Sequence, residues 1–417
     1  MMTDTRGGDT PEPTRDIEPG PAEVAHRLDR LARTGNPDVL WPDVSRDRRI
    51  AAAHAITSAI GPALTGQPAR LDHHDRPAIG IAAFVSGVGP LLGRWIADGL
   101  VTADPAVAHL LTTHLELGRA RYAHLAIATG RLVTLLRDLG VEPIVLKGPH
   151  LATYYPEPGA RMQSDVDLLL PSGARAAVET HLREAGWMVR RGPYDDRRVT
   201  WQPPDAPTLP TWLDRAGPDD PWTLDLHWTL DRARGALTAR LGDATSVART
   251  TIAIDRQAMT VLGHPDFLLF VASHASLGFD ELQLCRLVDL VLATRATPDL
   301  WWEALAAARE RRMPDLLFPS AALTARLAPG VVPTEVLRAL RAAANPRMRS
   351  AVDAVDGGTL LHRDVRTLRQ KLMWARHPTE ILRTLVSLMA VRQPATWRRR
   401  LRLVAGRLWR GHAGRGG

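Results

Sequence analysis

Residues 144–170 constrain this chain more than any other stretch. The stretch begins with an apolar run that ends in Lys147-Gly148, and it closes with Asp165 and Asp167 leading into three leucines. If the closing run is a β-strand, both aspartates point to the same face, because side chains alternate along a strand. Two such charges repel each other and are costly to desolvate. The pattern therefore favours a divalent cation between them, and Mg²⁺ prefers carboxylate oxygens and phosphates as ligands.

Lysine is rare in this chain, which draws attention to Lys147. Of 53 cationic residues only Lys147 and Lys371 are lysines, and all others are arginines. In such a composition arginine fills most positions that need only a positive charge. A lysine near two aspartates suggests that a compact point charge is needed there. Chance retention of the lysine is the alternative.

Length and cysteine content limit the class of protein. A chain of 417 residues has room for two or three domains. Cys285 is the single cysteine, so no internal disulfide can form, which fits a reducing compartment. We read residues 1–20 as a disordered leader without the apolar segment of a signal peptide, and we find no run typical of a transmembrane helix. We therefore expect a cytoplasmic protein.

The hydrophobic periodicity divides the chain into regions and predicts an α+β fold, with a small mixed β-sheet core embedded between N-terminal and C-terminal helical regions. After the leader we expect an N-terminal helical region over 21–140, an α/β core over 141–262, a helical domain over 263–361 and a basic helical tail over 362–417. In the first region we expect only helices, at 21–34, 47–64, 78–100 and 105–140.

The core should contain short strands and helices. We expect a short helix over 149–155 entered through Gly148, a helix capped by Ser172 that ends at Gly186, and a loop over 203–221. Strands are predicted at 142–146, 166–170, 187–189, 222–228 and 250–254. Helices are predicted beyond the core at 265–277, 280–294, 300–312, 315–327, 333–343, 364–376, 378–391 and 395–409.

A third acid lies on another alternating run. The sequence W-T-L-D-L-H-W at 222–228 places Thr223, Asp225 and His227 on one face of a strand and two leucines on the other. Asp225 is thus a candidate to join Asp165 and Asp167.

These motifs together carry a resemblance. The string L-K-G-P-H-L-A-T-Y-Y-P-E-P-G-A-R-M-Q-S-D-V-D-L-L-L, an amphipathic helix up to a Gly-Trp pair, and the later L-D-L-H-W resemble a family of largely uncharacterised bacterial nucleotidyltransferases. That family is similar to the polymerase-β-like nucleotidyltransferase superfamily. The resemblance covers roughly residues 135–292.

The resemblance implies roles for individual residues. Asp165, Asp167 and Asp225 would be the catalytic acids and would hold two Mg²⁺ ions, with Mn²⁺ as an alternative. One ion would activate an acceptor hydroxyl, and the other would bind the triphosphate of an NTP donor and the departing pyrophosphate. Lys147-Gly148 stands where the superfamily carries a Gly-Ser pair that contacts the nucleotide phosphates. Arg161 matches an arginine that could bind phosphate.

The resemblance leaves the acceptor undefined: a small molecule, a glycan, a peptide or an RNA end. It implies transfer of NMP with release of pyrophosphate. A kinase-like phosphotransferase that uses the same metal site, and a non-catalytic nucleotide-binding or adaptor protein, are the alternatives.

Several single residues have a structural alternative. Lys147 could form a salt bridge with one aspartate, His227 could hydrogen-bond beside the acids rather than bind metal, and Tyr154-Tyr155 could be core rather than a platform for a base. The remaining candidates, for which burial in a helical core is the default expectation, are His274, Asp289 and Cys285.

The C-terminal tail is strongly basic. From His362 onward the chain carries 14 Lys or Arg against two acids. The tail could be a solvated helical face, or it could contact an acidic partner, nucleic acid or a membrane surface, which tryptophans among the arginines would suit.

Overall fold

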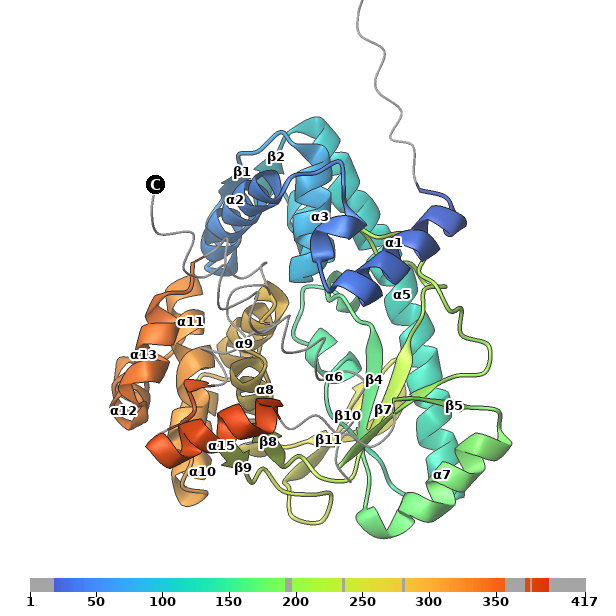
Figure 1. Ribbon diagram of the computed structural model, residues 1–417, viewed down its shortest axis with the longest axis vertical. Coiled ribbons are helices and arrows are strands. Elements are labelled where there is room, and N and C mark those ends of the chain that lie inside the picture. Colours follow the sequence, from blue (N-terminus) through green and yellow to red (C-terminus); the bar gives the residue numbers. More distant parts are fainter. Residues whose placement is uncertain are drawn as a thin grey trace, which may run out of the picture.

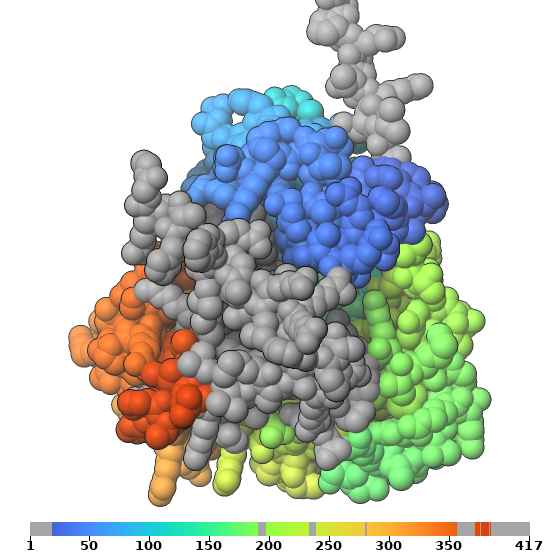
Figure 2. All heavy atoms as spheres, viewed as in Figure 1, coloured from blue at the N-terminus to red at the C-terminus, as the bar shows by residue number. Residues whose placement is uncertain are grey.

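The computed structural model describes residues 19–191, 197–234, 237–279, 282–356, 372–375 and 377–389. It confirms the α+β class, since a mixed seven-stranded sheet is flanked by N-terminal and C-terminal helices. In Figure 1 the N-terminal helices lie at the top, the sheet lies at the lower right and the C-terminal helices lie at the left. The same three regions occupy separate parts of the face shown in Figure 2.

The N-terminal region is mainly helical. The long helix α5 begins where expected, because Asp104 accepts a hydrogen bond from the backbone N–H of Ala106 and Pro105 occupies the first turn. Two short parallel strands, which the sequence did not predict, correct the expectation of helices alone. The elements are α1 (Pro21–Thr34), η1 (Pro37–Leu40), α2 (Arg46–Leu64), β1 (Ala69–Leu71), α3 (Arg76–Ser86), α4 (Gly89–Ala97), β2 (Val101–Ala103) and α5 (Pro105–Asp138).

The single helix expected over 78–100 is also wrong, because the chain breaks into α3 and α4 at Gly87. This glycine has φ +73°. A Cβ there would lie 2.7 Å from Sγ of Cys285, so a side chain would be both strained and crowded. No single described helix is long and apolar enough to cross a membrane, and only the pair α3 and α4, bent by 114°, meets that test together.

The sheet has the strand order β10-β11-β3-β4-β7-β6-β5. β4 and β7 pair in parallel at its centre, and β7 pairs antiparallel with β6. Two of the seven strands, β6 and β11, were not predicted. The strands are β3 (Ile144–Val145), β4 (Asp165–Leu169), β5 (Met188–Arg191), β6 (Arg198–Gln202), β7 (Thr223–His227), β10 (Arg249–Ile254) and β11 (Gln257–Leu262), with a separate hairpin of β8 (Arg232–Arg234) and β9 (Leu237–Ala239).

Two helices near the acids differ from expectation. The helix after Gly148 is the four-residue α6 (Pro149–Ala152), because Thr153 and the two tyrosines that follow lie in turns. Ser172 does not cap a helix. It opens a 3-10 turn (Ser172–Ala174) that separates it from α7 (Arg175–Glu184), whose N-cap residue makes no side-chain hydrogen bond.

The two faces of the sheet pack against different regions. Val166 and Leu168 of β4 belong to a core shared with α5 and α7, whereas Leu169 belongs to a core shared with the C-terminal helix α8. Asp165 and Asp167 lie on the same face of β4 as Leu169, because side chains alternate. The fold therefore turns both acids toward the C-terminal helices.

The C-terminal region is helical through the described residues. The predicted segment 395–409 and most of 364–376 lie outside the part of the chain that the structure describes. The helical elements are α8 (Asp266–Leu277), α9 (Leu284–Ala296), α10 (Leu300–Glu310), η5 (Pro314–Leu317), α11 (Phe318–Leu327), α12 (Thr334–Ala343), α13 (Pro346–Asp353) and α15 (Pro378–Met389).

Candidate functional site

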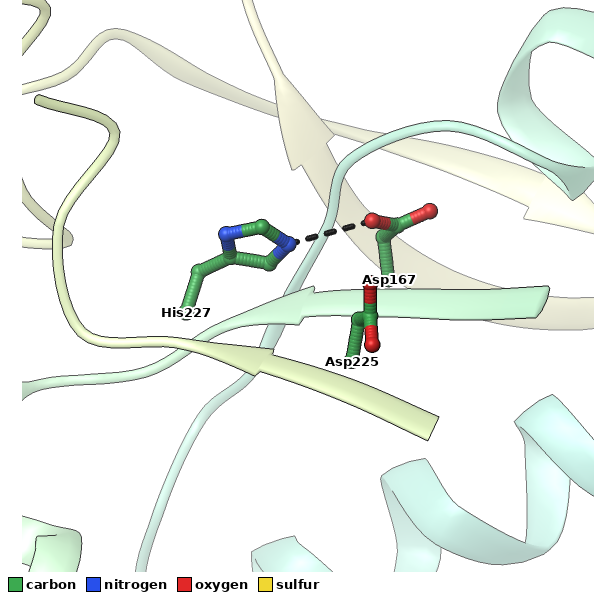
Figure 3. Close-up of side chains that lie close together, drawn as sticks. All are labelled: Asp167, Asp225 and His227. Carbon is green, nitrogen blue, oxygen red and sulfur yellow. Dashed lines mark hydrogen bonds and ion pairs between the residues drawn. The ribbon is translucent and has the colours of Figure 1, made fainter. Parts of the chain in front are cut away.

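Acidic side chains meet where β4 and β7 run side by side. The parallel register places Asp167 directly opposite Asp225, and Asp165 opposite Thr223. The alternation predicted for both strands therefore brings the acids to one face, where Figure 3 shows Asp167 beside Asp225. Asp167, Asp225 and His227 each offer one ligand atom, and these atoms lie within 4.8 Å of one another, so the three side chains could hold a metal ion. His227, rather than Asp165, is the third member of this cluster.

His227 is hydrogen-bonded to Asp167. Its Nε2 lies 3.1 Å from Oδ1 of Asp167, and its side chain is fully buried. Burial lowers the pKa of His227 to about 4 although Asp167 opposes this change, so the ring is neutral at pH 7. A neutral ring with its proton on Nε2 donates to the carboxylate. This geometry corresponds to the structural alternative for His227.

The two acids of β4 differ in charge environment. Nζ of Lys147 lies 2.9 Å from Oδ2 of Asp167. Burial by itself would raise the pKa of Asp167, but Lys147 and His227 hold it below its usual range. Burial and then the neighbouring Asp167 raise the pKa of Asp165 to about 6. The cluster thus contains more negative charge than Lys147 compensates, which is the electrostatic condition for binding a cation.

Asp225 is held by the neighbouring strand β6. Its Oδ1 accepts a hydrogen bond from Oγ1 of Thr200 at 2.6 Å, and its Oδ2 accepts one from Nη1 of Arg198 at 3.0 Å. Sequence reasoning missed both partners because it missed β6. The alternation of buried Val199 and Trp201 with more exposed neighbours is the signal that could have revealed this strand.

Lys147 and Gly148 form the turn between β3 and α6. Gly148 has φ +54° and ψ −108°, a backbone conformation that suits only glycine. A Cβ there would also lie 3.3 Å from Oε1 of Gln163, whose buried amide has no hydrogen-bond partner among the described residues. Because α6 is a single turn, a helix dipole contributes little to anion binding at this point. Lys147 supplies the positive charge of the turn.

Arg161 lies in a second charged cluster. Its Nε and Nη2 donate to the two carboxylate oxygens of Asp289 on α9 at 2.8 and 2.9 Å. The hydroxyl of Tyr155 donates to the same carboxylate at 2.9 Å. Burial alone would lower the pKa of Arg161, but Asp289 raises it above its usual value. The structure thus commits two guanidinium nitrogens of Arg161 to a buried ion pair, and its role toward phosphate stays a prediction.

Three side chains follow their structural alternatives. Tyr155 is buried in the core, and Tyr154 packs against that core and stacks on Phe267. Burial raises the pKa of Cys285 to about 11, which keeps it a protonated thiol that packs against the core.

The fold and the site define an α+β protein with a buried carboxylate cluster suited to a metal ion. The chain belongs to the family described as uncharacterised nucleotidyltransferase, whose model matches residues 75–329. This match extends on both sides beyond the residues 135–292 that carry the motifs. The search of curated proteins gives no match.

One solved structure with a weak likeness is the crystal structure of an antigenic nucleotidyltransferase-like protein from Paracoccidioides brasiliensis. It shares 11% sequence identity, with a TM-score of 0.31, and the comparison covers 52% of this chain and 97% of that chain. A likeness at this level says nothing about the function of the present chain.

Proposed function

We propose that this chain is a Mg²⁺-dependent nucleotidyltransferase of the polymerase-β-like superfamily that transfers NMP from an NTP to an acceptor hydroxyl and releases pyrophosphate. The observation that carries the proposal is the register of β4 and β7, which sets Asp167 opposite Asp225 with Asp165 on the same face. Membership of a nucleotidyltransferase family supports the reaction class.

The donor atoms at the site fit a hard divalent cation. Carboxylate oxygens are the ligands that Mg²⁺ and Mn²⁺ prefer, and the burial and neighbouring negative charge that raise the pKa of Asp165 favour a cation at this place. We assign Asp165, Asp167 and Asp225 as the metal-binding acids. His227 already donates to Asp167 and would keep that carboxylate oriented. When bound, the ions would supply charge neutralisation for the triphosphate and activation of the acceptor hydroxyl.

The remaining residues of the site would bind and orient the donor. Lys147 is only 15% exposed in its side chain and lies beside the acids, so its ammonium group can contact a phosphate without leaving the cluster. Gly148 supplies the backbone conformation of this turn, which a residue with a side chain would adopt only under strain. Arg161 keeps one guanidinium nitrogen that Asp289 does not bind, and this nitrogen could reach a phosphate oxygen.

A direct test uses NTPs labelled on the α- or the γ-phosphate, with Mg²⁺ and mixtures of acceptors. Nucleotidyl transfer places the α-label on the acceptor and releases labelled pyrophosphate from the γ-labelled NTP. Transfer of the γ-label to the acceptor would instead establish a kinase-like phosphotransferase. An absence of transfer with intact Mg²⁺-dependent NTP binding would favour the nucleotide-binding or adaptor alternative.

The acceptor and the location of the protein remain proposals of a broader kind. The acceptor class spans small molecules, glycans, peptides and RNA ends. We propose a cytoplasmic location because the single cysteine fits a reducing compartment. The basic tail, which could contact an acidic partner, nucleic acid or a membrane, lies mostly outside the described residues.

A further inference from the structure

One face of α8 covers the turn that follows Lys147-Gly148. Phe267 and His274 lie seven residues apart on α8 and therefore share a face of the helix. The ring of Phe267 lies 4.4 Å from that of His150 and 5.6 Å from that of Tyr154 between ring centroids. This face of α8 thus packs directly on α6 and its following turn.

Arg286 of α9 lies at the end of the same face. Gly278 follows His274 by four residues, so it continues the face at the C-terminal end of α8. A Cβ on Gly278 would come within 2.3 Å of Nη1 of Arg286, so the guanidinium lies directly on this glycine. The absence of a side chain at position 278 therefore leaves the space that the guanidinium occupies.

The next turn of α9 is anchored to the segment that leads into the sheet. Asp289 lies three residues after Arg286, on an adjoining part of the helix surface, and it binds both Arg161 and Tyr155. Because Arg161 shortly precedes β4 in the chain, this contact holds α9 against the segment that leads into the acids. Arg286 is held one turn away from that anchor.

Arg286 has no ion pair or hydrogen bond through its guanidinium with any residue that the structure describes, although the side chain is partly buried. A partly buried guanidinium that no described carboxylate pairs is available to bind a ligand of opposite charge. Arg161 on the same side of the site is, by contrast, occupied by Asp289. Arg161 and Arg198 are thus each bound to a carboxylate, whereas Arg286 is bound to none that the structure describes.

The titration of His274 supports this placement. Burial lowers the pKa of His274 well below its usual value, and the charges of Lys147 and Arg286 lower it further. The positive charges of Lys147, in the turn before α6, and of Arg286, on α9, thus both act on the same imidazole. The ring is neutral at pH 7, so it adds a hydrogen-bonding group without adding charge.

We propose that Arg286 binds the β- and γ-phosphates of the NTP donor, so that the helical domain completes the triphosphate site that Lys147 begins. This inference rests on the proposed function and names a residue of its donor site. A planar guanidinium suits bidentate contacts with phosphate oxygens, which a point charge such as Lys147 cannot make. Without a bound donor, the guanidinium of Arg286 lies against Gly278 and forms no ion pair with a carboxylate that the structure describes.

The test measures equilibrium binding of NTP, NDP and NMP with Mg²⁺ to the full chain. Variants are Arg286→Gln, Arg286→Lys and the matched control Arg295→Gln, which alters an exposed arginine on the same helix. Arg286→Gln should weaken NTP binding roughly tenfold to a hundredfold, the usual effect of a lost charge-assisted hydrogen bond, and should leave NMP binding within about twofold. Arg286→Lys should recover part of the loss, and Arg295→Gln should bind like the wild type.

The outcomes separate this inference from the proposed function. If the wild type binds NTP but Arg286→Gln binds NTP as tightly, Arg286 is not a phosphate ligand and the donor site stands without it. Equal losses for NTP and NMP would show a general disturbance of the site and would also overturn the inference. If the wild type binds none of the NTPs, the proposed function and this inference fail together. Thermal unfolding of each variant identifies any that does not fold, and Arg286→Lys then decides between the outcomes.

Discussion

Asp167 and Asp289 are both buried carboxylates paired with a cation, yet their surroundings differ. The carboxylate of Asp289 accepts two hydrogen bonds from Arg161 and one from Tyr155. Asp167 has Lys147 and a neutral histidine, and Asp225 has Arg198, but Asp165 on the same face forms no ion pair with a described residue. The charges in the cluster around Asp289 balance one another. The cluster around Asp167 carries negative charge that its own residues do not balance.

This difference teaches how the same residue types serve stability in one place and binding in another. The ion pair of Asp289 with Arg161 holds α9 against the segment that leads into β4. An unbalanced cluster lowers the stability of the free protein and is favourable only with a cation or a charged ligand, as is common for functional sites. Removing an acid should therefore have opposite effects in the two clusters.

The largest expected effect is the loss of enzymatic activity when the cluster around Asp167 loses a carboxylate. Asp167→Asn keeps the shape of the side chain but removes its charge, so nucleotidyl transfer should fall on the order of 10³-fold, since metal sites supply several kcal/mol of charge stabilisation. Initial rates with saturating NTP and Mg²⁺ measure the effect. Asp205→Asn, an exposed change in the loop before β7, serves as the control. A variant of Asp167 that is as active as the control would remove this carboxylate from the site.

A change in the cluster around Asp289 should lower the stability of the protein. Asp289→Asn leaves the guanidinium of Arg161, which is 12% exposed, without a counter-ion, and should lower the free energy of unfolding by about 3–5 kcal/mol. Denaturant titration followed by circular dichroism measures the change. The double variant Arg161→Met/Asp289→Leu should recover most of the loss, because an apolar pair needs no compensation. If the single variant is as stable as the wild type, the pair does not anchor α9.

The packing of α6 against α8 should depend on pH through His150. Burial lowers the pKa of His150 to about 4 from 6.5, so the unfolded state binds more protons between these pH values. The contribution of His150 is complete above pH 6.5 and is lost as the pH falls toward 4, by about 2 kcal/mol at pH 5. The difference in unfolding free energy between pH 7.5 and pH 5 should shrink by that amount in His150→Gln.

The exposed His54 provides the matched control for this measurement. His54→Gln should keep the pH dependence of the wild type. If His150→Gln and His54→Gln show the same pH dependence, α6 and α8 do not exclude water from His150. That result would contradict the packing of His150 against Phe267.

The smallest expected effect is a gain in stability when Asp165, in the cluster around Asp167, loses its charge. Asp165→Asn removes a carboxylate whose pKa is raised by burial and by Asp167, so it should stabilise the metal-free protein by about 1–2 kcal/mol at pH 8, allowing for partial exposure. Thermal or denaturant unfolding in the presence of a chelator measures the gain. Asp138→Asn, an exposed change at the end of α5, should leave stability unchanged. A loss of stability in Asp165→Asn would contradict the idea of an unbalanced cluster.

The sequence by itself determined the local parts of this protein. Alternation in two short runs placed Asp165, Asp167 and Asp225 on the correct faces, because side-chain direction along a strand depends only on neighbouring residues. The start of α5 at residue 105 was predicted for a similar reason, since the cap Asp104 bonds a backbone group only two residues away. Local rules failed at Gly87 and Ser172, where a contact with Cys285 and an intervening turn changed the helix ends.

Only the tertiary structure decided which groups meet. Asp289 lies 128 residues from Arg161, and the sequence gives no local signal that they pair. The partners of Asp225 were missed for a related reason, since a short strand is defined by its neighbours in the sheet more than by its own residues. The position of the Arg286 guanidinium against Gly278 likewise depends on how α8 and α9 pack together. The charge balance of each cluster, and with it the difference between Asp167 and Asp289, was therefore fixed by packing.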